Sequence, residues 1–258
     1  MSTPLFVQQN QPAGVPPLQL TGERTLPDVP EENYWFRRHL AVYRWITERV
    51  TDQRVVDMAC GEGYGSDLLA TTARSVVGVD ANPEAHAHAR ARYTRDNLRF
   101  ARDMVQTFDE SADAIVFLQT IEHLDDPGPT LDRFRSLVEP DGAVYVSTPN
   151  VLTLAPDGAR RSDNPWHVRE YRAAEFAELC EAHFGQVSLF SLFHARKLRV
   201  HELALRAGWD TVHERLHLTS AFYDRFTPAI VASDFALRPF RAGDDERRAL
   251  DFLALCRP

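Results

Sequence analysis

The chain of 258 residues has few cysteines, no long apolar run and no excess of positive charge. Its three cysteines, Cys60, Cys180 and Cys256, lie far apart and include no CxxC pair. This pattern excludes a disulfide framework and a cysteine-ligated zinc site. No apolar stretch approaches the roughly 18 residues of a membrane span, and the N-terminus lacks the apolar core of a signal peptide. We therefore expect a soluble, cytoplasmic protein.

The formal net charge is −8, with 29 Lys and Arg against 37 Asp and Glu. A surface that tracks nucleic-acid phosphates needs clustered basic residues, so a nucleic-acid partner is the least favoured one. The hydrophobic fraction of 44% and the charged fraction of 26% are typical of globular proteins. The length fits one large domain, or one domain with an appendage.

Residues 1–33 differ in composition from the rest of the chain, because they hold six of its sixteen prolines and few periodic apolar positions. We interpret this segment as an N-terminal arm without a core of its own. The aromatic residues that follow it, Tyr34 to Phe36, favour an arm that folds down onto the domain as a lid. Glu23 and Arg24 either close that lid over a site or form an ordinary solvated charge pair.

Short β-rich apolar runs alternate with helical patterns from residue 34 onward. The five expected strands are RVVDMA, SVVGVD, LRFARD, DAIVFLQT and GAVYVSTP, and three later runs, GQVSLFSLF, ASDFALRP and LDFLALC, are also typical of strands. The pattern predicts one α/β domain over residues 34–258. We expect a Rossmann-like, seven-stranded, mostly parallel sheet with helices on both faces and an antiparallel C-terminal strand. A helical insertion is expected around residues 198–230.

The stretch VVDMACGEGYGS, Val55 to Ser66, places three glycines between the first expected strand and its helix. Such a turn lets the backbone approach a nucleotide closely. The spacing GxGxG differs from the dinucleotide fingerprint GxGxxG, and no P-loop lysine follows. Asp57 at the strand tip suits a cationic, amino-bearing ligand better than a pyrophosphate.

This stretch resembles the glycine motif of class I S-adenosylmethionine-dependent methyltransferases, and strand order and spacing agree with that family over about residues 36–150. The resemblance implies S-adenosylmethionine as the cofactor. It assigns Asp80 to the ribose hydroxyls, Asp103 and Met104 to the adenine, and Gln119 to the cofactor lining. The cofactor-binding residues that it implies are Asp57, Gly61, Gly63, Asp80, Asp103, Met104 and Gln119.

Further segments of the sequence resemble a group of bacterial sugar and polysaccharide O-methyltransferases, including the actinobacterial type that acts in methylglucose lipopolysaccharide assembly. The matching segments are GERTLP, RRHLAVYRWI, TPNVLTLAPDGARRSDNPWHVREYRAAEF and FSLFHARKL. This resemblance implies a sugar or polysaccharide acceptor. His39 and Tyr43, one turn apart on the first expected helix, face either the cofactor or the acceptor, or His39 covers the sheet edge.

Methyl transfer to a sugar hydroxyl needs a base, because the hydroxyl is a poor nucleophile near neutral pH. His123 follows the fourth expected strand and His167 lies after the fifth, at the sheet edge where open α/β proteins bind ligands. We predict that His123 is the base and that His167 orients the acceptor. His86 and His88, on the second expected helix after the glycine turn, are expected to face solvent.

Three alternatives stay open. IEH followed by HVREYRAAEF also resembles small-RNA 2′-O-methyltransferases, in which a Glu, two His and a further Glu bind a divalent metal. Glu122, His123 and His167 match, but Gln119 replaces the further acid, which weakens Mg²⁺ binding most. We therefore favour base catalysis without a metal. In the second alternative, the acceptor is a quinone-type phenol or another small molecule. In the third, the chain is a cofactor-binding regulatory protein without catalysis.

Overall fold

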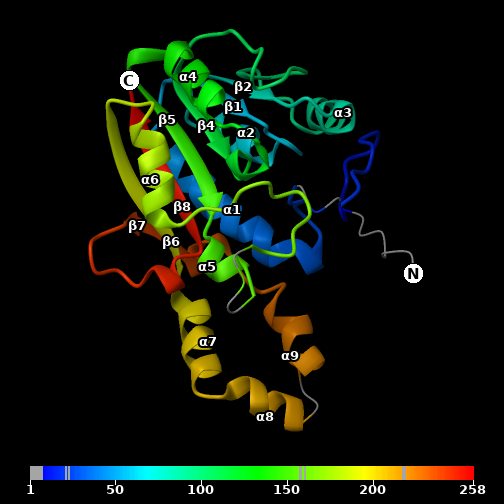
Figure 1. Ribbon diagram of the computed structural model, residues 1–258. Helices are drawn as coiled ribbons and strands as arrows, with labels where there is room; N and C mark the ends of the chain where they lie inside the picture. Colours follow the sequence, from blue (N-terminus) through cyan, green and yellow to red (C-terminus); the bar gives the residue numbers. More distant parts are fainter. Residues whose placement is uncertain (1–7, 21, 23, 157–158, 160, 217–218) are drawn as a thin grey trace.

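The computed structural model describes residues 8–20, 22, 24–156, 159, 161–216 and 219–258. A single eight-stranded sheet forms its centre, with strand order β3-β2-β1-β4-β5-β8-β6-β7 (Figure 1). The strands are β1 (Arg54–Met58), β2 (Ser75–Val79), β3 (Leu98–Ala101), β4 (Ala112–Leu118), β5 (Val138–Pro149), β6 (Gln186–His194), β7 (Phe235–Pro239) and β8 (Asp251–Arg257).

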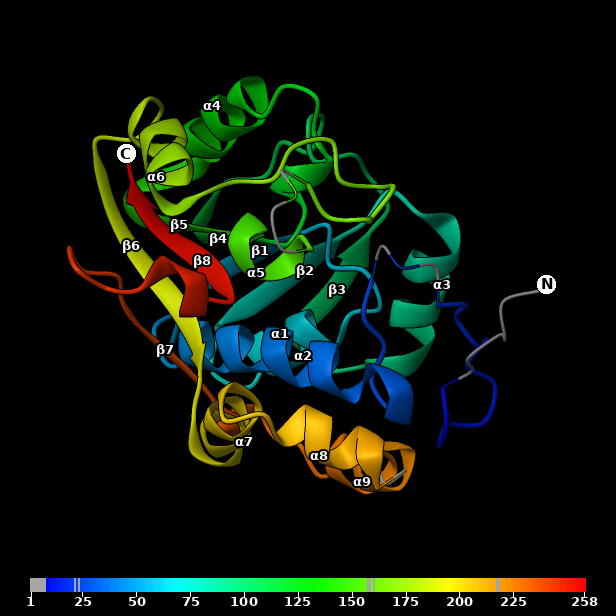
Figure 2. The same cartoon turned by 60° about the horizontal axis from the view of Figure 1, so that its bottom comes forward.

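Helices cover both faces of this sheet. The α-helices are α1 (Asn33–Thr47), α2 (Tyr64–Leu69), α3 (Pro83–Arg92), α4 (Gly128–Leu137), α5 (Val151–Leu154), α6 (Ala173–Glu181), α7 (Arg196–Arg206), α8 (Trp209–Arg215) and α9 (Thr219–Phe226). Helices α4 and α6 lie on one side of the sheet, and α1 and α2 lie on the other (Figure 2). Short 3-10 turns occur at Pro30–Glu32, Ile121–His123, Ala232–Asp234 and Glu246–Arg248.

Strands β1 to β5 pair in parallel, and their sequences explain why. The four residues from Val55 to Met58 of β1 are all buried, as are the four from Val76 to Val79 of β2. A parallel sheet covered by helices on both faces needs apolar side chains on both sides of each strand, so these runs are continuous rather than alternating.

The C-terminal edge corrects the expected strand number. The three late runs all form strands, so the sheet has eight strands rather than seven. Strand β8 lies between β5 and β6 and is antiparallel to both. Strand β7 pairs antiparallel with β6 and forms the outer edge. Helices α7, α8 and α9 connect β6 to β7 and extend beyond the end of β6 (Figure 1).

The arm packs against the glycine turn and α3 rather than lying free. Leu18, Leu26 and Val29 are buried together, so the expectation that the arm has no core of its own was wrong. Asp28 of the arm pairs with Arg92 of α3 at 2.9 Å. The aromatic-rich segment after the arm starts α1, whose Ile46 is fully buried against the sheet.

Candidate active site

Two adjoining cavities open at the carboxyl ends of the parallel strands. The first, which we call the glycine-turn cavity, has a volume of about 600 Å³ and is lined by residues that include Gly61, Asp80, Asn82, Leu118 and Trp166. The second, which we call the histidine cavity, has a volume of about 400 Å³ and is lined by residues that include Trp35, Glu122, Leu154, Asp163 and His167. Both cavities share Arg24, Thr25, His39, Gln119 and His123.

The glycine turn connects β1 to α2 through residues in the left-handed region. Ala59, Gly61 and Gly63 have φ values of 57°, 56° and 98°. Ala59 and Gly61 line the glycine-turn cavity. A left-handed alanine is unusual, and nothing in its residue type marks Ala59 as a site residue in the sequence.

The other two glycines of the motif serve packing in this structure. A Cβ on Gly63 would lie 2.9 Å from Cβ of Ala89, and one on Gly65 would lie 2.1 Å from Cζ of Tyr43. Neither glycine lines the glycine-turn cavity, although Gly63 was a predicted cofactor contact. The helices and strands around α2 can approach closely because these positions carry no side chain.

Asp57 points into the interior and not into the cavity. It is fully buried and accepts hydrogen bonds from Ser66 Oγ at 2.6 Å and Tyr43 Oη at 3.1 Å. Burial raises the pKa of Asp57 to about 7, against the lowering effect of these two hydrogen bonds. Its visible role is to join α1 and α2 beneath the glycine turn, and any contact with a cofactor stays a prediction.

Asp80 stands at the end of β2 and lines the glycine-turn cavity. Its two carboxylate oxygens accept the backbone N–H groups of Gly61 at 2.8 Å and Asn82 at 2.9 Å. These bonds fix the carboxylate beside the turn, and each oxygen keeps a further lone pair for a ligand hydroxyl.

Asp103 and Met104 follow β3 and lie outside the lining of either cavity. The Asp103 carboxylate accepts hydrogen bonds from the Met104 N–H and the Thr107 hydroxyl, and Met104 is 51% exposed. The predicted contact of this pair with adenine stays a prediction.

Gln119 follows β4 directly and lines both cavities. Its φ of 50° places a non-glycine residue in the left-handed region. Its backbone N–H donates to the Ser147 carbonyl, and its side-chain amide donates to Ser147 Oγ at 3.0 Å. These bonds to β5 hold the Gln119 backbone at the border between the cavities.

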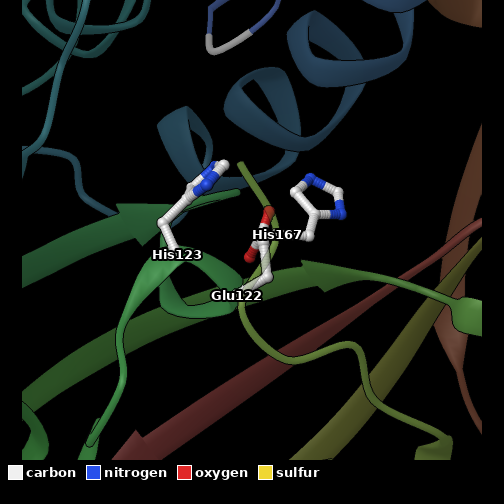
Figure 3. Close-up of side chains that lie close together, drawn as sticks. All are labelled: Glu122, His123 and His167. Carbon is white, nitrogen blue, oxygen red and sulfur yellow. The ribbon is translucent and has the colours of Figure 1, made fainter. Parts of the chain in front are cut away.

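Glu122, His123 and His167 come together at the histidine cavity (Figure 3). One potential ligand atom from each residue lies within 4.8 Å of the others. Burial raises the pKa of Glu122 to about 8, against the lowering effect of the Thr148 hydroxyl. Within the described part of the chain, the buried Oε2 of Glu122 has no hydrogen-bond partner at normal distance and angle. The backbone carbonyl of Glu122 accepts the N–H groups of Val168 and Arg169, which ties the two loops together.

The hydrogen bonds of the two imidazoles indicate their tautomers. His123 Nδ1 lies 2.8 Å from the carbonyl oxygen of Trp166, which can only accept, so Nδ1 carries a proton, and in the neutral ring the lone pair is on Nε2. His167 Nδ1 lies 2.7 Å from Glu170 Oε1. Although burial opposes it, hydrogen bonds from Ser162 and His167 lower the pKa of Glu170, which leaves a carboxylate to orient His167.

His39 and Tyr43 of α1 both reach the glycine-turn cavity. Burial lowers the pKa of His39 to about 4, so its imidazole is neutral near pH 7. Its Nδ1 lies 3.4 Å from Thr25 Oγ1, and the same hydroxyl lies 2.9 Å from Tyr64 Oη. Arg24 of the predicted lid pair lines both cavities, whereas Glu23 lies outside the described residues.

A buried polar network behind the glycine turn was not expected from the sequence. His88 was predicted to face solvent, but it is fully buried and contacts Glu62 Oε1 at 2.9 Å and the Pro16 carbonyl at 2.6 Å. Glu62 also accepts from Gln8 and Tyr93. Gln8 and Pro16 belong to the arm, so packing of the arm is what buries His88.

The comparisons with known proteins agree with this arrangement. A family profile described as a methyltransferase domain matches residues 33–214. The chain belongs to the class I S-adenosylmethionine-dependent methyltransferases. It is 39% identical over 246 residues to a probable S-adenosylmethionine-dependent methyltransferase of Mycolicibacterium smegmatis, covering 92% of this chain and 94% of that one.

Two other similarities are more distant. The methyltransferase is 30% identical over 114 residues to a ubiquinone biosynthesis O-methyltransferase of Pseudomonas savastanoi, covering 41% of this chain and 49% of the relative. A solved structure of a methyltransferase from Thermotoga maritima, described as a possible histamine N-methyltransferase, superposes with a TM-score of 0.57 at 14% identity. It covers 89% of this chain and 95% of that one, and it shows the fold alone.

The cofactor of this methyltransferase is S-adenosylmethionine, and the glycine-turn cavity fits it chemically. At Ala59 and Gly61 the backbone can lie close to the cofactor. The Asp80 carboxylate can accept hydrogen bonds from the two ribose hydroxyls. The cluster of Glu122, His123 and His167 also fits a divalent cation, since two imidazoles and a carboxylate form a known ligand set.

Across the described residues, no helix has the length and apolar character needed to cross a membrane.

Proposed function

We propose that this methyltransferase transfers the methyl group of S-adenosylmethionine to a hydroxyl of a sugar or polysaccharide. The observation that carries the proposal is the position of His123, which lines both the glycine-turn cavity and the histidine cavity. A base at that border lies where cofactor and acceptor meet. The cofactor supplies an electrophilic methyl group, so the protein has to position the hydroxyl and remove its proton.

The histidine cavity supports a polyhydroxylated acceptor. Glu32, Ser162 and Asn164 line it with side chains that hydrogen-bond hydroxyl groups. Trp35 adds a partly exposed aromatic surface, and Leu154 and Pro156 add apolar contacts. Mainly apolar walls with a few placed polar groups are typical of sites for small molecules and their extensions.

In the proposed reaction, Nε2 of His123 takes the proton of the acceptor hydroxyl as its oxygen bonds to the methyl carbon. The bond between that carbon and sulfur breaks, and its electron pair stays on sulfur. His167, held by Glu170, orients the acceptor from the other side of the histidine cavity. The arm over residues 1–33 acts as a lid, because Thr25 of the arm contacts both His39 and Tyr64 at the cavity wall.

A divalent cation held by Glu122, His123 and His167 is the second candidate mechanism. The specific observation that favours it is the buried, unpartnered Oε2 of Glu122 among the described residues. A bound cation would supply Lewis acidity to the acceptor oxygen. Against it, Gln119 stands where a further carboxylate would strengthen the ligand set, and its amide is bonded to Ser147.

A phenolic acceptor is the second candidate substrate class. It is favoured by the partial similarity to a ubiquinone biosynthesis O-methyltransferase. A phenol has a pKa near 10 and ionises far more readily than a sugar hydroxyl, so it depends less on a base.

The experiment that separates these acceptors is transfer of an isotope-labelled methyl group to a panel of glucosides, mannosides, phenols and RNA. We expect label on a glucoside or mannoside, in an alkali-stable ether linkage. Label on the phenols alone would replace the sugar acceptor by the phenolic one. No label on any acceptor, with cofactor binding intact by calorimetry, would favour a regulatory protein.

A further inference from the structure

Arg24 brings a positive charge to the two cavities. It lines both the glycine-turn cavity and the histidine cavity. Across the described residues, its guanidinium makes no hydrogen bond or ion pair, whereas Arg38 of α1 is paired with Asp251 at 2.5 Å. A half-buried arginine beside a cavity, with five N–H donors and no acceptor, needs an anion or water there.

Arg24 is placed by residues on both sides of it in the arm. Thr25, its neighbour, contacts Tyr64 at 2.9 Å, and Leu26 is fully buried. The turn is close as well, since a Cβ on Gly61 would lie 3.9 Å from Cβ of Arg24. The arm therefore holds Arg24 opposite the glycine turn, at the end of the cavity that adjoins the histidine cavity.

The charges around the two cavities indicate which anion Arg24 meets. Within the described part of the lining, Arg24 is the one Lys or Arg of the glycine-turn cavity. S-adenosylmethionine carries a carboxylate on its amino-acid end, and that group requires a cationic or N–H partner. Apart from the protonated Glu122, the histidine cavity contains the acidic residues Glu32 and Asp163, which disfavour an anionic acceptor beside Arg24.

We propose that Arg24 binds the carboxylate of the amino-acid end of the cofactor. Arginine matches a carboxylate through paired N–H donors, which gives orientation as well as attraction. This role rests on the cofactor of the family and does not depend on the identity of the acceptor. It places a cofactor contact on the arm, outside the β-sheet and its connecting loops.

Calorimetry with two unreactive ligands tests the proposal. S-adenosylhomocysteine keeps the carboxylate, and its decarboxylated analogue, 5′-deoxy-5′-(3-aminopropylthio)adenosine, differs from it in that group alone. For the wild-type protein, we expect the carboxylate to increase affinity about 10- to 100-fold, as for a charged hydrogen bond. In Arg24→Met this difference should disappear, because the affinity for S-adenosylhomocysteine falls and that for the analogue stays nearly constant.

Two further variants complete the test. Arg24→Lys keeps the charge without the paired donors, so we expect it to retain part of the preference for the carboxylate. Arg90→Met removes an exposed arginine from α3, outside both cavity linings, and should bind both ligands as the wild type does. Thermal unfolding without ligand verifies that each variant is folded.

Two results would overturn the proposal. An equal loss of affinity for both ligands in Arg24→Met would mean that Arg24 only supports the arm. Unchanged affinity for both ligands would mean that Arg24 does not contact the carboxylate of the cofactor. Since these measurements use binding in the absence of acceptor, they stay informative even where the sugar assignment fails.

Discussion

The imidazoles of His123 and His167 lie in a T-shaped arrangement, with ring centroids 5.1 Å apart and planes at 72°. They come from separate loops, after β4 and after β5, and their Nδ1 atoms contact different acceptors, the Trp166 carbonyl and the Glu170 carboxylate. One histidine therefore has a neutral orienting partner and the other an ionised one. This difference gives the two residues separable roles.

The first prediction concerns the base. His123→Ala should lower kcat by about 10²- to 10⁴-fold, because the variant lacks the base that accepts the proton in the transition state. The affinity for S-adenosylhomocysteine should stay nearly constant, since the base does not contribute to cofactor binding. Steady-state kinetics and calorimetry measure the two quantities. His183→Ala, which removes a histidine paired with Asp132 away from both cavities, is the matched control. Near-normal kcat in His123→Ala would leave His167 as the candidate base.

The second prediction concerns cofactor binding. Asp80→Ala should weaken binding of S-adenosylhomocysteine about 10-fold or more, since a carboxylate acceptor of hydroxyl hydrogen bonds is lost. The Gly61 and Asn82 N–H groups lose their acceptor too, so thermal unfolding of the variant must be compared with the wild type. Asp132→Ala on α4 is the control. Unchanged affinity by calorimetry would remove Asp80 from the cofactor site.

The third prediction concerns a metal. Exhaustive treatment with EDTA should leave turnover nearly intact, because the cluster has one carboxylate and burial keeps it protonated near pH 7. Activity assays before and after chelation, with metal analysis of the protein, measure this. Loss of turnover that Mg²⁺, Mn²⁺ or Co²⁺ restores would assign Glu122, His123 and His167 to a metal site.

The fourth prediction concerns the pH dependence of stability. The pKa of Glu122 rises from 4.5 to about 8 on folding, so between these values the folded state binds more protons than the unfolded chain. The stabilising contribution of Glu122 to the free energy of unfolding is therefore fully present below pH 4.5. It decreases as the pH rises from 4.5 to about 8 and is lost above that.

Glu122→Gln removes this titration. We compare the free energies of unfolding of the variant and the wild type, both in chelator. The difference in favour of the variant should be roughly 2 to 5 kcal/mol larger at pH 9 than at pH 5. Urea unfolding at both pH values measures the difference, and comparison with the wild type cancels the similar titration of Asp57. An equal stability difference at pH 5 and pH 9 would contradict the buried, protonated carboxyl.

The fifth prediction concerns the last glycine of the turn. Gly65→Ala should destabilise the protein by about 3 kcal/mol or more, because the new Cβ would lie 2.1 Å from Tyr43 Cζ. Adding Tyr43→Ala should reduce the cost of the alanine, which a double-mutant cycle detects. Gly128→Ala, where the nearest atom is a side-chain oxygen at 3.3 Å, is the milder control. Equal costs at the two sites would contradict the packing role of Gly65.

Much of the fold could be predicted because it depends on local patterns. The continuous apolar runs of β1, β2 and β4 predicted strands buried on both faces, and their alternation with helices predicted a parallel sheet. The sheet edge that collects Gly61, Asp80 and His123 follows from that topology, since each residue lies in the connection that follows a strand. The eighth strand was miscounted because no local pattern tells how late strands pair.

The sequence by itself determined the sheet, the glycine turn and the edge that carries the site, since periodicity and residue type set backbone conformation over a few residues. Only the tertiary structure decided which side chains meet. His88 is buried because Pro16, 72 residues earlier, covers it, and Glu122 approaches His167 through contacts between two loops. Gly63, a predicted cofactor contact, packs closely against Ala89, and Gly65 packs closely against Tyr43. These outcomes depend on packing between segments distant in the chain, which local periodicity does not encode.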